Sequence, residues 1–321
     1  MIKILYAGSP EAACQTLKIL FEKQNECGFE IVGVLSNPPA AKGRHKELIP
    51  TPVAAFAAEK GLPVFTPEHL DSACREQIAP LAADLLLSFA YGHIFGPKFL
   101  ALFPLGGMNL HPSLLPKYRG CTPVPAAILN RDAQTAVTVQ TLALGMDEGD
   151  ILAQEVVELN GSETAQSLLS YSAECGAGLF CDLLKKLAAG QKLTGRAQEG
   201  EASYTGIIKK EDGKIDWSED GLKIEAKIRA YFPEPGCWCL EKDLPLRILS
   251  ASFISDDDQR AAAYKAEPCG KVLAFVKAEG IYVKAKGGIL LVKTLQRQGK
   301  KEMAYKDFMN GARDFVGCQL Q

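Results

Sequence analysis

The 321-residue sequence has no uninterrupted apolar run of about 18 residues, the length that a membrane-spanning helix needs. It opens directly on an apolar stretch, Ile2 to Ala7, where a secretion signal would have a basic region followed by an apolar segment and a cleavage site. These two absences predict a cytoplasmic protein without a membrane partner.

Recognisable metal and disulfide patterns are also missing. The ten cysteines are scattered, only Cys237 and Cys239 stand close together, and no Cys-x-x-Cys pair or Cys/His cluster has the spacing of metal ligands. We therefore expect reduced thiols that mostly fill the core, and no bound metal.

Three widespread enzyme motifs do not occur. Gly8-Ser9-Pro10 follows the first apolar stretch, where a dinucleotide-binding loop would read Gly-x-Gly-x-x-Gly, and Pro10 lacks the backbone N–H that such a loop needs. Asn37-Pro38 stands where an acidic ribose ligand is expected. There is also no Walker loop and no Gly-x-Ser-x-Gly elbow, so the sequence argues against nicotinamide enzymes, P-loop NTPases and α/β-hydrolases.

What is present is the composition of a globular protein, with 47% hydrophobic and 23% charged residues, on a chain long enough for two domains. Its first half alternates β-rich runs with helical patterns, which predicts an α/β, Rossmann-like domain around a parallel sheet. We expect strands at Ile2–Ala7, Glu30–Ser36, Pro63–Phe65, Asp84–Phe89, Gly106–His111, Ala136–Ala143 and Ile151–Leu159. Helices are expected to begin near Pro10, Pro52, Ser72, Pro97 and Glu163.

The pattern changes after residue 189. Residues 190–206 are polar and glycine-containing, which is typical of a linker. Residues 207–321 then show a helix at Lys223–Tyr231 and short β-rich runs, which predict a small β-barrel of the OB type. These runs are Gly236–Leu240, Leu246–Ile254, Gly270–Val276, Gly280–Ala285 and Ile289–Leu295.

The formal net charge of −2 conceals a local imbalance. Between Lys265 and Lys306 there are nine lysines and one arginine against three glutamates, a net charge of +7. Such a block is either a solvated face or a surface that binds phosphates.

The most informative stretch follows the fifth expected strand. Alternation along that strand places the side chains of Asn109 and His111 on one face, and Pro112 ends the hydrogen-bonded ladder. Two polar side chains would then lie at the carboxyl end of a strand, where open α/β sheets bind ligands. A hydrogen-bonded strand end without a catalytic role is the competing interpretation.

These residue types fit acyl transfer to an amine. An asparagine amide can donate to a developing oxyanion, and a histidine can exchange a proton near neutral pH. A neighbouring carboxylate would favour the imidazolium. The candidate is Asp147 in the turn-rich segment Gly145–Asp150, and spacing alone does not separate it from Glu148 or Asp150.

With these motifs in hand, the sequence resembles the folate-dependent formyltransferases over nearly its whole length. The family combines an Asn-x-His strand end, a following Ser-Leu-Leu-Pro run and a downstream aspartate in a glycine-flanked loop. The resemblance implies that Asn109, His111 and Asp147 are catalytic and that 10-formyltetrahydrofolate is the formyl donor. It also implies folate binding by the run Ser113, Leu114, Leu115 and Pro116.

Within the family, the chain is similar to the members that formylate initiator methionyl-tRNA. The basic loop with Lys42, Arg44 and Lys46 resembles their tRNA-contacting insertion, and the +7 block would then hold tRNA phosphates. Residues 1–189 would form the catalytic domain and 207–321 the tRNA-binding barrel of a monomer. Two alternatives remain: a formyltransferase acting on a UDP-amino sugar, and a tRNA- or folate-binding module without activity.

Overall fold

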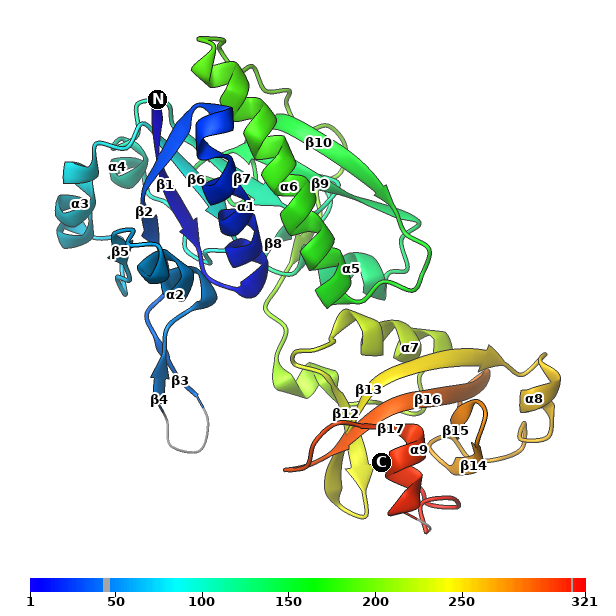
Figure 1. Cartoon of the computed structure of the whole chain (residues 1–321). Helices are drawn as coiled ribbons and strands as arrows, with labels where there is room; N and C mark the ends of the chain where they lie inside the picture. Colours follow the sequence, from blue (N-terminus) through cyan, green and yellow to red (C-terminus); the bar gives the residue numbers. More distant parts are fainter. Residues whose placement is uncertain (43–46, 313) are drawn as a thin grey trace. The chain divides into compact units, whose positions relative to one another are not determined.

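The computed structural model describes residues 1–42, 47–312 and 314–321, and these divide into two compact units (Figure 1). The first unit contains residues 1–123, 134–158 and 168–206, and the second contains residues 124–133, 159–167 and 207–321. The segment predicted as a linker therefore groups with the first unit. No helix in the described part of the chain combines the length and the apolar character needed to cross a bilayer.

The first unit is built on a seven-stranded sheet, and the predicted α/β class is confirmed. In spatial order the strands are β10 (Ile151–Glu158), β9 (Gln134–Thr141), β7 (Gly107–His111), β6 (Leu85–Phe89), β1 (Ile2–Gly8), β2 (Phe29–Leu35) and β5 (Val64–Phe65). Neighbours from β7 to β5 are parallel, whereas β7–β9 and β9–β10 are antiparallel. Strand β7 therefore has a parallel neighbour on one side and an antiparallel neighbour on the other.

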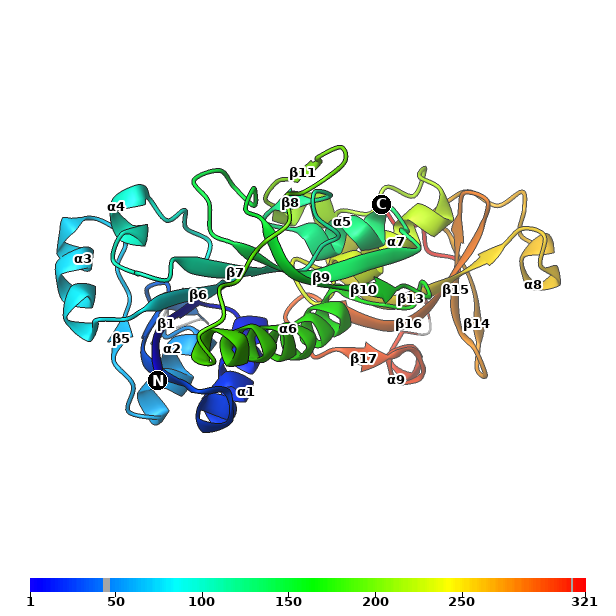
Figure 2. The same cartoon turned by 90° about the horizontal axis from the view of Figure 1, so that it is seen from above.

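Helices cover both faces of this sheet, and Figure 2 shows α1 and α6 side by side under one of them. One apolar cluster packs α1 (Glu11–Cys27), α2 (Pro52–Glu59) and α6 (Ala165–Ala188) against that face. A second cluster, rich in phenylalanine, packs α3 (Ser72–Ile78) and α4 (Pro97–Leu100) against the other. The sequence predicted where these helices begin because residues that start helices stand there, as with Thr51, whose hydroxyl accepts a bond from the amide of Ala54.

Several short elements were not predicted. Strands β3 (Ala40–Lys42) and β4 (Glu47–Ile49) form a hairpin, and β8 (Arg119–Gly120) pairs in parallel with β11 (Tyr204–Thr205). The helix α5 (Pro123–Leu129) was also missed. Strands of two or three residues are too short to show alternation, so the sequence carries no periodic signal for them.

The second unit contains an antiparallel sheet whose strands match the predicted β runs. Its order is β12 (Cys237–Glu241), β13 (Leu244–Ser255), β16 (Gly288–Arg297), β15 (Gly280–Ala285) and β14 (Val272–Val276), with β17 (Met303–Ala304) beside β16. Helices α7 (Gly221–Ala230), α8 (Gln259–Ala262) and α9 (Tyr305–Asn310) complete it, α7 lying where the helix Lys223–Tyr231 was expected.

The C-terminal tail joins the two edges of this sheet. At one edge Leu240 and Gln321 exchange backbone hydrogen bonds of 2.6 and 3.1 Å. At the other, the amide of Val272 donates to the carbonyl of Cys318 at 2.9 Å, and the amide of Leu320 donates to the carbonyl of Gly270 at 2.9 Å. The tail therefore closes the sheet into a small barrel and satisfies backbone groups that an open edge would expose.

Candidate active site

Strand β7 presents two of the predicted catalytic side chains. Asn109 lies opposite Gln140 of the antiparallel strand β9, and His111 lies opposite Thr138 of the same strand. The two-residue period of the strand places both on one face, as the sequence predicted. Pro112 follows directly, so this pair lies at the carboxyl end of β7.

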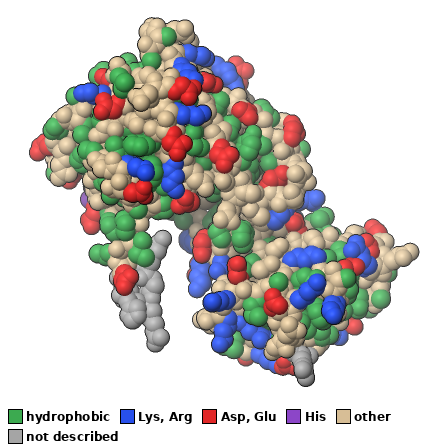
Figure 3. All heavy atoms as spheres, viewed as in Figure 1, with side chains coloured by type: hydrophobic (Ala, Val, Ile, Leu, Met, Phe, Trp, Pro, Cys, Tyr) green, Lys and Arg blue, Asp and Glu red, His purple; other side chains and the backbone are tan. Residues whose placement is uncertain are grey.

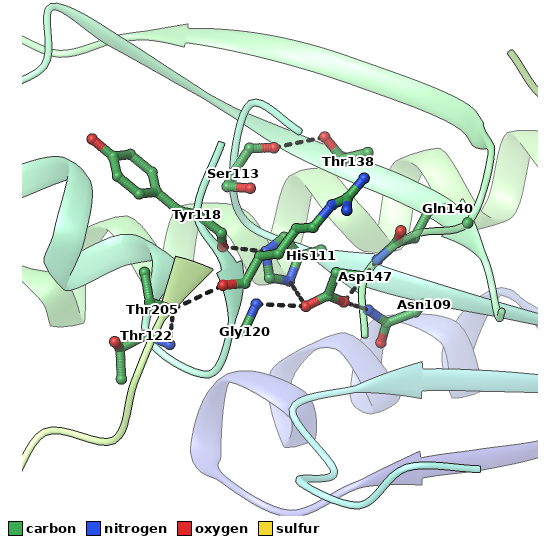
Figure 4. Close-up of polar contacts among 12 residues, drawn as sticks. Asn109, His111, Ser113, Tyr118, Gly120, Thr122, Thr138, Gln140, Asp147 and Thr205 are labelled. Carbon is green, nitrogen blue, oxygen red and sulfur yellow. Dashed lines mark hydrogen bonds and ion pairs between the residues drawn. The ribbon is translucent and has the colours of Figure 1, made fainter. Parts of the chain in front are cut away.

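The carboxylate of Asp147 is the centre at which these side chains meet (Figure 4). Its Oδ1 accepts from the Asn109 amide at 3.3 Å and from the Gln140 amide at 2.8 Å. Its Oδ2 accepts from the backbone amide of Gly120 at 2.8 Å and lies 3.5 Å from Nδ1 of His111. The structure thus brings Asn109, His111 and Asp147 together although 36 or more residues separate Asp147 from the pair.

The two rival carboxylates of the same loop belong to residues that are more exposed than Asp147. Glu148 forms an ion pair with Arg119 at 3.3 Å and is half exposed, and Asp150 is exposed. Asp147 itself has a left-handed backbone with φ of 55°, a conformation that a non-glycine residue adopts at a cost. Gly149 allows this tight loop, because a Cβ there would lie 1.7 Å from the carbonyl oxygen of Thr141.

The imidazole of His111 is almost fully buried and faces an oxygen at each nitrogen. Its Nε2 lies 2.9 Å from the carbonyl oxygen of Tyr118, and its Nδ1 faces Asp147. A carbonyl oxygen only accepts hydrogen bonds, so Nε2 carries a proton. The imidazolium is the form that donates on both sides. The 3.5 Å contact between Nδ1 and Asp147 is longer than a good hydrogen bond, so it does not fully use an N–H on Nδ1 when the ring is in that form.

The predicted folate-binding run follows β7 directly in the chain. Ser113 is buried, its hydroxyl donates to the carbonyl of Lys117 at 2.7 Å, and its own carbonyl accepts from Thr138 at 2.7 Å. Leu115 and Pro116 are buried, whereas Leu114 is partly exposed. The Ser113 hydroxyl is therefore used in a bond within the run, and Leu114 is the residue of the run whose surface is partly accessible.

Of the predicted tRNA-binding residues, Lys42 is the last residue of β3, and Arg44 and Lys46 lie outside the described residues. In the described ranges, no group of three or more His, Cys, Asp or Glu side chains is arranged to hold a metal ion.

Sequence reasoning missed three residues that contact the Asp147 loop. Gln140 is buried and donates to the carboxylate, Gly120 donates through its backbone, and Gln198 bonds to the carbonyl oxygen of Asp147 at 2.8 Å. Gln140 had a usable signal, because it alternates with Val137 and Val139 and so lies on the same face of β9 as Thr138. The other two had none, since their contacts arise only from the tertiary fold.

Cysteine chemistry provides a first prediction. Cys121, next to Gly120, is exposed, whereas burial raises the pKa of Cys237 and of Cys239 to about 12. Because the thiolate is the reactive form, iodoacetamide at pH 8 should label Cys121 in the native protein and leave Cys237 and Cys239 unlabelled until the chain is unfolded. Peptide mass mapping measures this. Cys121→Ser should keep near-normal activity, and a large loss would indicate a catalytic thiol.

Comparisons with known proteins agree with this geometry. Residues 2–182 match the family model described as formyl transferase, and residues 207–313 match the model described as formyl transferase, C-terminal domain. The methionyl-tRNA formyltransferase of Treponema denticola is 41% identical over 323 residues, which cover 98% of each chain.

Two solved structures share the fold. The methionyl-tRNA formyltransferase from Clostridium thermocellum superposes with a TM-score of 0.57 at 18% identity, covering 78% of this chain and 93% of that one. The N-formyltransferase from Helicobacter canadensis, solved with folinic acid and dTDP-3-aminofucose, gives a TM-score of 0.63 at 20% identity, covering 92% of this chain and all of that one.

Proposed function

The chain belongs to the methionyl-tRNA formyltransferases of the formyl transferase family, and from that membership we propose how its residues carry out the reaction. The enzyme transfers a formyl group to the α-amine of methionyl-tRNA. We propose that 10-formyltetrahydrofolate is the donor, that initiator methionyl-tRNA is the acceptor in the cytoplasm, and that the product serves translation initiation. The observation that carries the proposal is the convergence of Asn109, His111 and Asp147.

Asn109 and His111 stabilise the charge that develops on the formyl oxygen. When the amine attacks the formyl carbon, the carbonyl electron pair moves onto that oxygen. The amide of Asn109 has two N–H groups, and the bond to Asp147 uses one, so the other can donate to the oxyanion. The Nδ1–H of His111 supplies a second donor with positive charge, while the Tyr118 carbonyl holds the ring in place through Nε2.

Asp147 keeps the site electrically balanced. Its carboxylate lies 3.5 Å from Nδ1 of His111 and accepts from neutral donors on both oxygens, so its negative charge is tolerated in a nearly buried position. When the tetrahedral centre collapses, the donor nitrogen leaves with a proton and the attacking amine loses one. We propose that Asp147 manages this exchange through a water molecule.

The loop that contains Asp147 also offers a surface for the donor. Leu144 and Met146 are 65% and 47% exposed, which is unusual for apolar side chains. Together with the partly exposed Leu114 they provide apolar surface within the chain segments that hold the reacting groups, as a flat heterocyclic ring requires. The folinic acid in the Helicobacter canadensis enzyme supports a folate donor here.

One experiment decides whether the formyl acceptor is a charged tRNA or an amino-sugar nucleotide. Labelled 10-formyltetrahydrofolate is offered with charged initiator tRNA, charged elongator tRNA and an amino-sugar nucleotide in parallel. We expect transfer to the initiator tRNA, far slower transfer to the elongator tRNA and none to the sugar. Transfer to the sugar alone would replace the proposal by the rival activity, and no transfer at all would favour a binding module.

Surface charge favours tRNA over the sugar. Of the ten cations in the +7 block, four form ion pairs or hydrogen bonds with other residues of the second unit. Lys284 is buried in an ion pair with Asp256, Lys271 pairs with Glu267, Arg297 pairs with Glu241, and Lys293 donates to the carbonyl of Glu279. Six lysines remain exposed, namely Lys265, Lys277, Lys286, Lys300, Lys301 and Lys306. Figure 3 shows Lys and Arg side chains over the visible face of this unit. Six exposed lysines can contact several phosphates of a tRNA at once, and binding a small sugar nucleotide does not require so many cations.

The basic segment from Lys42 to Lys46 gives a second prediction. Replacing Lys42, Arg44 and Lys46 with glutamine should raise the KM for tRNA, leave the KM for folate unchanged, and reduce the slope of log affinity against log salt by about two. Steady-state kinetics at several salt concentrations measures both effects. A matched control replaces three exposed lysines elsewhere in the first unit, Lys23, Lys186 and Lys192, with glutamine. If both triple variants weaken tRNA binding alike, the loop has no special role.

A further inference from the structure

The segment predicted as a linker runs along the first unit and ends in β11. Arg196 exchanges two backbone hydrogen bonds with Ile151, of 2.8 and 3.0 Å, at the start of β10. Tyr204 and Thr205 then pair with β8. Gln198 lies between these two attachments, in the part of the segment that meets the Asp147 loop.

The carboxamide of Gln198 binds the loop with its nitrogen. Its Nε2 lies 2.8 Å from the carbonyl oxygen of Asp147 and 2.8 Å from that of Gly149, and 3.3 Å from the side-chain oxygen of Gln140. Gln140 in turn donates to the Asp147 carboxylate. One side chain therefore fixes the backbone on both sides of Glu148 and touches the residue that orients the carboxylate.

The oxygen of the same carboxamide is held in place by an arginine. Oε1 of Gln198 accepts from Nε of Arg119 at 3.2 Å and from a terminal nitrogen at 2.9 Å. This two-pronged contact determines which end of the carboxamide faces the loop, because the guanidinium only donates. The NH2 group of Gln198 must then point to the Asp147 and Gly149 carbonyls.

The loop needs such support because of its own backbone. Asp147 has φ of 55°, and a residue in this region relaxes unless its surroundings hold it. Relaxation would turn the carboxylate away from Asn109 and His111. The backbone carbonyls that Gln198 binds belong to Asp147 itself and to Gly149, two residues later.

We propose that Gln198 is a positioning residue that holds the Asp147 loop in its reactive conformation by donating to the two loop carbonyls. The proposal rests on the catalytic role of Asp147 given above. It assigns a task in the reaction to a segment of the first unit that sequence patterns present as a connector.

Two variants separate this role from a merely structural one. Gln198→Met removes both the donor and the acceptor, whereas Gln198→Glu keeps an acceptor for Arg119 and removes the donor. If the donor positions the loop, both variants should lose about 10- to 100-fold in kcat with little change in the KM for either substrate. If Gln198 only anchors Arg119, Gln198→Glu should behave like the unaltered enzyme, which would overturn the proposal.

Amide hydrogen exchange gives a readout that does not depend on activity. The backbone amide of Gly120 donates to Oδ2 of Asp147, so it reports whether the carboxylate stays in place. In both variants the Gly120 amide should exchange at least tenfold faster, while amides of the central strand β1 keep their rates. Unchanged Gly120 exchange would overturn the proposal.

Gln154 provides a matched control. It is also a half-buried glutamine of the first unit that donates to a neighbour, Thr138 at 2.8 Å, and accepts from an arginine, Arg196 at 2.7 Å. Gln154→Met should leave kcat and Gly120 exchange nearly unchanged, and a loss equal to that of Gln198→Met would overturn the proposal.

If the unaltered protein transfers no formyl group, the proposed function fails, but the exchange measurement still decides whether Gln198 positions the loop.

Discussion

Asp147→Asn is expected to lower kcat/KM for formyl transfer by about 10²–10⁴-fold, the range that a positioned acid–base group contributes. The substitution removes the negative charge that faces the imidazole of His111. It also places an NH2 group where the carboxylate accepts from Asn109, Gln140 and Gly120, so at least one pair of donors must face each other. Single-turnover kinetics with saturating donor isolates the chemical step.

The loss should appear in turnover far more than in folding. Asn has nearly the same size as Asp, so we expect the free energy of unfolding to change by no more than about 1–3 kcal/mol, the cost of leaving buried polar groups without partners. Asp150→Asn is the matched control, because its carboxylate is exposed in the same loop. It should retain nearly full activity. Near-normal turnover by Asp147→Asn would contradict the assigned mechanism.

The sequence predicted the scaffold of this site more completely than its interior contacts. Regular strands and capped helices leave periodic patterns, and β7 with Asn109 and His111 lies where alternation placed it. The spacing of the sequence could not decide among Asp147, Glu148 and Asp150, because side chains in a turn do not alternate in direction with a fixed period. Resemblance to a family selected Asp147, and the structure then showed that its carboxylate meets the pair.

Contacts made by isolated polar residues were beyond the reach of pattern analysis. Gln198 stands in a polar, glycine-containing stretch where every local rule predicts a solvated connector. Its position depends on Arg119, 79 residues earlier, and on backbone carbonyls of a loop about 50 residues earlier. Similarly, three of the ten cations in the +7 block form ion pairs within the second unit. One of them, Lys284, pairs with Asp256, and these two charges approach each other only in the folded barrel.

Asn109→Ala is the other substitution with a large expected effect, a fall in kcat of about 10²–10³-fold, as found when one oxyanion donor is removed. The alanine leaves Asp147 with its bonds from Gln140 and Gly120, so the carboxylate should stay in place. The KM for the folate donor should change little, because the lost bond forms only as charge develops on the formyl oxygen. Asn160→Ala is the control, because Asn160 is an exposed asparagine in a turn, and it should leave kcat and KM unchanged.

Combining Asn109→Ala with His111→Ala tests whether the two donors act on the same oxygen. If both stabilise one oxyanion, losing the first already disrupts the arrangement that the second requires, and the double variant should lose much less than the product of the two single losses. Independent sites would instead give a fully multiplicative loss. The structure favours the first outcome, because Asn109 and His111 share Asp147, one through each carboxylate oxygen. A multiplicative loss would mean that one of the two acts outside the reacting carbonyl.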